Sequence, residues 1–473
     1  MSEEKKSCSA KPTLTYALVT IGILCLFIIV SLTVLNFPIT VTLFFSWLLL
    51  APFAMKLGYT VAEMEEHVYD MIKYGVGMFA LLLAIGCMVS IWICAGTVPT
   101  LIYWGLNVIT PKIFLLIAFL VCTVVSIPTG TSWGTASTVG VAMMGVGMGL
   151  GIQPGLVAGA VISGAYVGDV LSPVSDTPLL TSTVCEVPVM SHIRHNLFLV
   201  VPSVLISAVI YGIYGMLFVD SSLDATSLAV ITETLAETFH IGILTLIPLA
   251  VVLGLLAAKQ SSLSAIMAGC VVGAVIAVLY QGFTPEQVFN FMATGFSMET
   301  GNELLDPILD RGGISSMQDL ISMVVAALGM GGILKGCGFL DTLVESLSGV
   351  IHSRIGLTVA TTVGCSLCVV LVGTNYFSMI LNGTMMAPLY QKLGYQKVNA
   401  SVLVNNLSCA GSFFVPWGMG ALFFSATLGA TFSQMAPFIF FNMVLILLNV
   451  LTGFLGVLMP RERDDTGGQR IIS

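Results

Sequence analysis

Two carboxylates lie in one polar stretch of an otherwise apolar sequence. Residues 163–183 read SGAYVGDVLSPVSDTPLLTST and contain Asp169 and Asp176 together with Pro173 and Pro178. A charge is costly in hydrocarbon, and each proline leaves a backbone carbonyl without its helical partner. Such a segment is tolerated at membrane depth only where it faces protein or a wet cavity. The stretch therefore predicts a broken helix that forms an ion site.

The alternative interpretation is a loop at the membrane surface, where Asp, Ser and Pro are ordinary residues. Apolar runs at 157–167 and 197–218 flank the stretch on both sides. These runs, and the internal repeat described below, favour the position at membrane depth.

The composition is that of a membrane protein. The 473 residues are 57% hydrophobic and only 8% charged, and the mean hydropathy is +1.02. No soluble domain buries that much apolar surface, so we expect an all-α polytopic membrane protein in contact with lipid. The sequence has neither the nucleotide-binding pattern G-x-x-x-x-G-K-[ST] nor the metalloprotease pattern H-E-x-x-H. We therefore expect no ATP-driven pump, no enzyme, no bound cofactor and no nucleic-acid partner.

Charge distribution predicts how the chain is placed in a cell membrane. Residues 219–240 contain four acidic residues and no Lys or Arg, so the positive-inside rule makes this linker extracytoplasmic. The tails, residues 1–13 and 460–473, carry Lys or Arg and are expected in the cytoplasm. Residues 14–218 and 241–459 then form two transmembrane halves that start on opposite sides, as inverted-topology repeats require.

An internal repeat supports this division. When 243 is subtracted from the residue number, five second-half residues match a first-half residue of the same type. The matches are Gly373 with Gly130, Thr374 with Thr131, Gly394 with Gly151, Gly411 with Gly168 and Pro416 with Pro173. Each half thus has one Gly-Thr break and one Pro break. In transporters built from inverted repeats, such broken or re-entrant helices meet near the membrane midplane and form the site.

The two halves differ in chemistry at the matched positions. Asp169 aligns with Ser412 and Asp176 with Met419, so only the first half supplies carboxylates. We expect both aspartates to bind Na⁺ and H⁺ in competition, because a carboxylate in a semi-dry site binds a proton near neutral pH. The neutral ligands expected around them are Thr131, Ser132, Ser172, Ser175, Thr177, Thr374, Asn375, Asn405 and Asn406.

Other polar residues have two interpretations each. Glu299, Glu303, Asp306 and Arg311 either cap a re-entrant element or act as a gate in the ion path. Lys335, in an apolar run, either extends to the interface or is a counter-charge to an aspartate or to a substrate carboxylate.

Two further segments are expected at the membrane surface. Residues 61–73 alternate charged and apolar residues at helical spacing and predict an interfacial amphipathic helix. His192 and His195 are expected to be solvated loop residues, with pH sensing as the alternative.

The chain resembles the NhaC family of Na⁺/H⁺ antiporters, within the ion-transporter superfamily. The similar segments are GTVPT at 96–100, GTSWGT at 130–135, SGAYVGDVLSPVSDT at 163–177 and TGNELLDPILDRGGISSM at 300–317. Val170 stands where the family signature has Lys. The resemblance implies secondary active transport by alternating access, coupled to Na⁺ or H⁺, and a homodimer.

The same family includes exchangers of small carboxylates and amino-acid transporters. The sequence therefore predicts Na⁺/H⁺ exchange, with coupled transport of a dicarboxylate, hydroxy acid or amino acid as the alternative.

Overall fold

The protein is all-helical. The computed structural model describes residues 10–219, 225–298, 300–302, 305–348 and 351–461, and these contain helices and two isolated β-bridges but no strand. Among the described residues, nine helices are long and apolar enough to cross a membrane, or up to twelve if each of three bent pairs is one span. The prediction of a polytopic α-helical membrane protein is confirmed.

The first half contains a series of long helices interrupted by short ones. Their bounds are α1 Leu14–Thr33, α2 Ile39–Lys56, α3 Val61–Cys94, α4 Thr97–Val108, α5 Pro111–Thr129, α6 Ser132–Thr135, a π-helical turn Ala136–Gly140, α7 Val141–Gly149, α8 Pro154–Leu171, α9 Asp176–Val184 and α10 Val189–Phe218.

The second half follows a helix in the acidic linker. The bounds are α11 Ala225–Thr238, α12 Ile247–Ala257, α13 Ser262–Leu279, α14 Pro285–Thr294, α15 Asp306–Leu309, α16 Gln318–Gly336, α17 Phe339–Ser348, α18 Arg354–Val372, α19 Asn375–Lys392, α20 Lys397–Gly411, α21 Met419–Leu428, α22 Phe432–Met435 and α23 Phe440–Leu455, with 3₁₀ turns before α12, α16, α21 and α23.

The predicted Gly-Thr breaks occur in both halves. α5 ends at Gly130 and α18 ends at Gly373, with φ of +65° and +75°. That left-handed conformation is strained for residues with a Cβ, so glycine ends each helix there. Thr131 and Thr374 then occupy the N-cap positions of the returning helices α6 and α19. A chain that reverses in this way forms a helical hairpin in each half.

The predicted Pro breaks also occur. α8 ends at Leu171, and Ser172–Pro173–Val174–Ser175 separates it from α9. In the second half, α20 with its 3₁₀ turn is bent by 54° from α21 across the break that contains Pro416. Breaks leave backbone carbonyls and amides without helical partners, which makes them available to side chains and ions.

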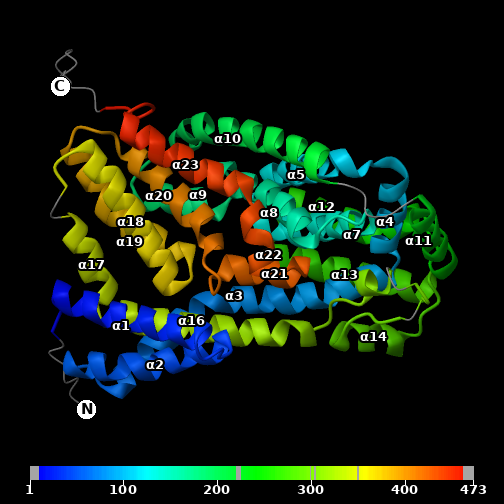
Figure 1. Ribbon diagram of the computed structural model, residues 1–473, viewed down its shortest axis with the longest axis horizontal. Helices are drawn as coiled ribbons and strands as arrows, with labels where there is room; N and C mark the ends of the chain where they lie inside the picture. Colours follow the sequence, from blue (N-terminus) through cyan, green and yellow to red (C-terminus); the bar gives the residue numbers. More distant parts are fainter. Residues whose placement is uncertain (1–9, 220–224, 299, 303–304, 349–350, 462–473) are drawn as a thin grey trace.

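The two hairpins lie toward opposite ends of the molecule (Figure 1). α5 and α7 lie toward the right-hand end of the view, with α4 and α11, whereas α17, α18 and α19 lie at the left-hand end with the start of α1 and the end of α23. α5 packs along α8, α19 packs against both α9 and α20, and α3 packs against α16. Elements of the two halves are thus adjacent around the helix breaks. The relation of the halves as inverted repeats is consistent with this placement and remains a prediction.

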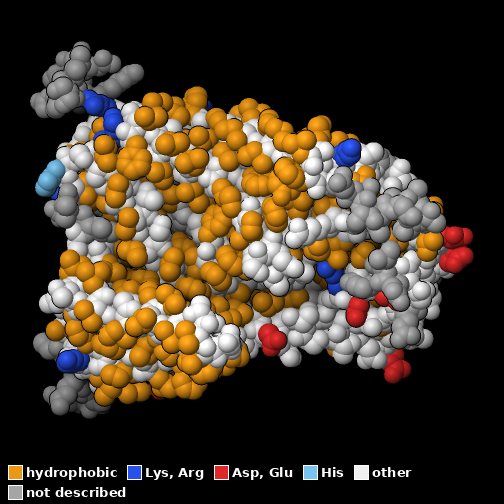
Figure 2. Space-filling model, viewed as in Figure 1, with side chains coloured by type: hydrophobic (Ala, Val, Ile, Leu, Met, Phe, Trp, Pro, Cys, Tyr) orange, Lys and Arg blue, Asp and Glu red, His pale blue; other side chains and the backbone are white. Residues whose placement is uncertain are grey.

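Hydrophobic side chains cover most of the visible face (Figure 2), and acidic side chains gather at the right-hand end, where α11 and α14 lie. A broad apolar surface with few charged side chains is what a bilayer requires of a spanning protein.

Two expectations about surface segments are wrong. Residues 61–73 do not form a separate interfacial helix, because α3 is continuous over 34 residues and begins with a capping box between Thr60 and Glu63. His192 is not a solvated loop residue: it lies in α10, is fully buried, and its Nδ1 is 2.8 Å from Ser401 Oγ. A polar residue inside a membrane helix is stable where a neighbouring helix offers a partner.

Candidate functional site

Asp169 lies in the last turn of α8, and its side chain is only 7% exposed. Its Oδ2 accepts a hydrogen bond from Ser132 Oγ at 2.8 Å, and Cys409 Sγ lies 3.5 Å from the same oxygen. Its backbone carbonyl accepts hydrogen bonds from Ser175 Oγ at 2.8 Å and Thr177 Oγ1 at 2.6 Å. The predicted ligands Ser132, Ser175 and Thr177 therefore lie around Asp169. Ser132 comes from the hairpin, Ser175 from the helix break and Thr177 from the first turn of α9.

A close approach of two helices holds this centre in place. Ser126 Oγ in α5 donates to the carbonyl of Gly164 at 3.0 Å and accepts from the backbone N–H of Gly168 at 3.0 Å. A Cβ at Gly168 would lie 1.9 Å from the carbonyl oxygen of Ser126, so only glycine allows this contact. The residue before Asp169 is thereby fixed against α5, the helix that leads to Ser132.

The second carboxylate, Asp176, has a different environment from the one expected. It is the first residue of α9 and is exposed rather than enclosed in a semi-dry site. Tyr376 Oη, in the first turn of α19, donates a hydrogen bond to Asp176 Oδ2. Asp176 thus faces the outside of the helix break and contacts the second-half hairpin, while Asp169 faces the protein interior.

Two of the expected neutral ligands hold the backbone of the breaks. Thr131 Oγ1 accepts a hydrogen bond from the N–H of Gly134 at 3.2 Å. Ser172 is buried, and its Oγ accepts from the N–H of Val174 at 3.4 Å. These residues shape the two breaks beside Asp169.

The neutral residues of the second half lie around the same breaks with varied partners. Asn405 Oδ1 accepts from Thr181 Oγ1 at 3.2 Å, and its buried Nδ2 has no hydrogen-bond partner within the described residues. Thr374 Oγ1 is likewise buried and unpartnered there. Asn375 is the first residue of α19, directly before Tyr376. Unsatisfied buried polar atoms are uncommon and indicate a position where an ion, water or substrate can be accommodated.

Asn406 belongs to a side-chain network instead. Its Nδ2 donates to Asn196 Oδ1 at 2.7 Å and to Asn449 Oδ1 at 3.2 Å. Asn196 Nδ2 donates in turn to the carbonyl of Val170 at 2.8 Å. The network therefore joins α10, α20 and α23 to the end of α8, next to Asp169.

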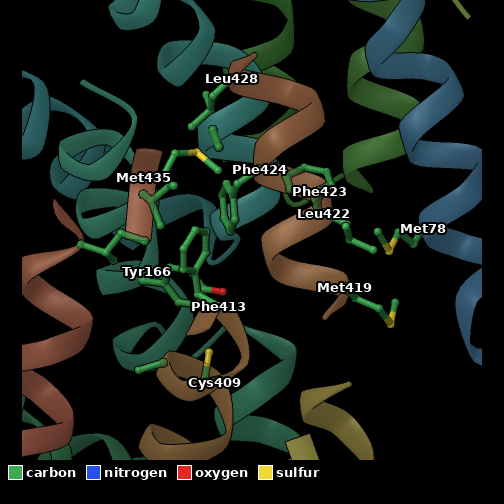
Figure 3. Close-up of a cluster of buried hydrophobic side chains, with 14 of the residues drawn as sticks. Met78, Tyr166, Cys409, Phe413, Met419, Leu422, Phe423, Phe424, Leu428 and Met435 are labelled. Atoms are coloured by element: carbon green, nitrogen blue, oxygen red, sulfur yellow. The ribbon is translucent and has the colours of Figure 1, made fainter. Parts of the chain in front are cut away.

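An aromatic layer lies beside Cys409 (Figure 3), whose Sγ is 3.5 Å from the Asp169 carboxylate. The close-up shows Cys409 next to Tyr166 and Phe413, with Phe424 and then Leu428 farther away along the same direction. Tyr166 packs against Phe424 with ring centroids 5.6 Å apart, and Phe413 packs against Phe424 at 6.0 Å. The aromatic layer thus lies between Cys409 and the Leu428 end of α21, whereas Asp176, at the start of α9, is exposed.

Of the expected gate residues, Asp306 and Arg311 are described, and their hydrogen-bond partners lie away from Asp169. Glu299 and Glu303 lie outside the described residues. Asp306 Oδ1 accepts from the N–H of Thr300 at 3.0 Å, a local contact at the start of α15.

Arg311 and Lys335 contact other elements. The guanidinium of Arg311 donates to the carbonyl of Leu428 at 3.3 Å and contacts Met148 Sδ at 3.3 Å. Arg311 thus joins the end of α21 to α7. The ammonium of Lys335 lies over the rings of Tyr74 and Phe377.

Sequence reasoning missed three side chains near the carboxylates: Tyr166, Tyr376 and Cys409. Tyr376 had a usable signal, because it follows the Thr374–Asn375 break directly. For Tyr166 and Cys409 the sequence gives no such signal. Their positions near Asp169 depend on how α8 and α20 pack together.

Comparison with known proteins gives the family. The family model described as "Na+/H+ antiporter family" matches residues 4–194 and 164–457. The Malate-2H(+)/Na(+)-lactate antiporter of Bacillus subtilis is 34% identical, over 96% of this chain and 97% of that protein. The Na(+)/H(+) antiporter NhaC of Alkalihalophilus pseudofirmus is 34% identical, over 96% and 98%. The arginine/ornithine antiporter ArcD of Halobacterium salinarum is 30% identical, over 86% of each. The chain belongs to the Na⁺/H⁺ antiporter family.

Proposed function

We propose that this protein exchanges Na⁺ for H⁺ across the cell membrane by alternating access, with Asp169 as the group that binds either ion. The observation that carries the proposal is a buried carboxylate surrounded by neutral oxygens. None of the three ion pairs among the described residues includes Asp169 or Asp176.

A single buried carboxylate suits a monovalent cation. An unpaired charge is costly at this depth, so the carboxylate is stable when a proton or a cation neutralises it. Hydroxyl and carbonyl oxygens are the ligands that hard cations prefer. Ser132, Ser175 and Thr177 supply hydroxyls next to the carboxylate and carbonyl of Asp169. Each can rotate its hydroxyl hydrogen away and present a lone pair to Na⁺.

Asp176 supplies the second part of the proposal. As an exposed carboxylate on the same break, it attracts Na⁺ to the entrance, and its bond to Tyr376 connects the break to the second-half hairpin. The aromatic layer of Tyr166, Phe413 and Phe424 blocks the opposite direction in this conformation. Alternating access requires this asymmetry, because a site open to both sides would leak ions.

We also propose that residues 14–218 and 241–459 are inverted repeats, with both termini in the cytoplasm and the protein a homodimer. Three observations support the topology: the matched breaks at Gly130 and Gly373, the start of α1 and the end of α23 at the same end in Figure 1, and the acidic opposite end in Figure 2. Cysteine labelling of the two ends in whole cells tests the orientation. Chemical crosslinking in membranes tests the dimer.

The exchange itself is tested in proteoliposomes that contain a pH-sensitive dye. An inward Na⁺ gradient, with no organic solute present, is expected to alkalinise the lumen promptly. No proton movement under any Na⁺ gradient would overturn the proposal.

A second candidate function is exchange coupled to an organic solute. The observation that favours it is that two of the relatives above have names that include malate and lactate or arginine and ornithine. Vesicles that are silent with Na⁺ alone but respond when one such solute is added would assign this function instead.

A further inference from the structure

A cavity lies between α3 and α16, and neither Asp169 nor its hydrogen-bond partners line it. Its volume is about 400 Å³. Its polar lining consists of Lys335 from α16 and His67, Asp70, Lys73 and Tyr74 from α3. Nothing in the exchange mechanism above uses these residues.

Two glycines in α16 define one wall of this cavity. A Cβ at Gly336 would lie 2.1 Å from His67 Cγ, and a Cβ at Gly332 would lie 2.6 Å from the carbonyl oxygen of His67. The glycines let α16 approach α3 at this level. The cavity is therefore set by direct packing of the two helices.

Lys335 is the cation that the cavity leaves available. Its ammonium lies 4.8 Å from the ring centroid of Phe377 and 5.5 Å from that of Tyr74. Among the described residues it forms no ion pair, whereas Asp70 on the same wall is bound by Lys73 at 2.6 Å. Asp341 on α17 is within electrostatic range of Lys335 without forming an ion pair with it. A partly buried ammonium without an ion-pair partner can form a charge-assisted hydrogen bond to an anion.

We propose that this cavity binds a small organic anion through a carboxylate that pairs with Lys335. Cavities of about 300–1,000 Å³ are typical of small-molecule sites. The ring of Tyr74, which lines the cavity, can pack against the carbon skeleton while the ammonium of Lys335 binds the carboxylate. The site does not depend on Na⁺ exchange at Asp169, and it would give the second candidate function a location.

Helix α19 connects Lys335, in the wall of the cavity, with Asp176. Phe377, beside Lys335, is adjacent in sequence to Tyr376, which donates to Asp176. One turn of α19 therefore contacts both Lys335 and Asp176. An anion that displaces the Lys335–Phe377 contact acts on the same hairpin that contacts Asp176.

The test is a binding titration on the purified full-length protein, followed by thermal unfolding. Lactate and malate serve as the carboxylate probes, and inorganic phosphate serves as the anion without a carboxylate. We expect saturable stabilisation by at least one carboxylate. Lys335→Gln is expected to weaken this binding about tenfold or more, because it removes a charge-assisted hydrogen bond.

Matched variants separate charge from folding. Lys335→Arg keeps the charge and is expected to bind within a few-fold of the native protein. Lys112→Gln makes the same charge change at an exposed lysine in the first turn of α5 and is expected to leave binding unchanged. Lys335→Gln is also assayed for Na⁺-driven proton movement without any organic solute. Retained movement shows that the variant is folded, and it keeps the test of anion binding separate from the test of Na⁺/H⁺ exchange.

Three results would overturn the proposal. The first is equal carboxylate binding by Lys335→Gln and the native protein. The second is no saturable binding of either carboxylate. The third is phosphate binding as tight as that of the carboxylates, which would indicate a general anion site, such as one for a lipid headgroup.

Discussion

Replacing Ser132 with alanine is predicted to weaken Na⁺ binding without unfolding the protein. Ser132 Oγ donates to Asp169 Oδ2 at 2.8 Å from α6, the short helix that follows the Gly130 break. A hydrogen bond to an ionised group contributes roughly 1.5–3 kcal/mol, which corresponds to about 10- to 150-fold in affinity. Alanine also removes one oxygen ligand of the cation. We therefore expect the Na⁺ concentration for half-maximal exchange to rise about 30-fold.

The assay is Na⁺-dependent proton movement in proteoliposomes, measured over a wide range of Na⁺ concentrations. Ser137→Ala is the matched control, because Ser137 is also buried and lies in the adjoining helical turn. Its hydroxyl donates to the carbonyls of Trp133 and Gly134 and not to Asp169. The control is expected to stay close to the native value. If Ser132→Ala and Ser137→Ala give the same half-saturation as the native protein, Ser132 is not part of the ion site.

Two further predictions concern stability. Gly168→Ala should lower the free energy of unfolding by about 3 kcal/mol, because the added Cβ would overlap the carbonyl oxygen of Ser126 and force α5 and α8 apart. Gly254→Ala is the control, since a Cβ at Gly254 would have no neighbouring atom within 4 Å. Equal melting temperatures of the two variants would contradict the packing argument. Lys397 donates to Glu186 at 2.6 Å and holds the pKa of that carboxyl below its ordinary value of 4.5. The pair therefore stabilises the fold above pH 4.5, and this contribution is lost as the pH falls through the lowered folded-state pKa of Glu186. Lys397→Met should lower the melting temperature at neutral pH and approach the native value in acid, and a difference that does not change with pH would refute this.

The breaks of the fold could be predicted from the sequence because their causes are local. Gly130 and Gly373 end helices in a left-handed conformation, and Pro173 interrupts a helix whatever surrounds it. The constant offset between the halves then identified corresponding breaks without any knowledge of packing. The grouping of Ser132 and Thr177 around Asp169 followed from the same reasoning.

What the sequence did not predict depends on tertiary contacts. His192 is buried because Ser401 of a distant helix provides a partner, and its charged neighbours suggested a loop instead. Residues 61–73 continue directly into a membrane helix, since their apolar residues pack on α16 and their charged side includes the wall of the Lys335 cavity. The exposure of Asp176 likewise depends on how α9 and α19 meet.

The central claim is that Na⁺ and H⁺ compete for the Asp169 carboxylate. Its most direct test is proton release from the purified protein in weakly buffered detergent solution when Na⁺ is added. The native protein and Asp319→Asn, a change at an exposed residue near the start of α16, are expected to release a proton with the same Na⁺ dependence. Asp169→Asn is expected to release none while it remains folded. Undiminished Na⁺-induced proton release from Asp169→Asn would contradict the account and place the exchange site elsewhere.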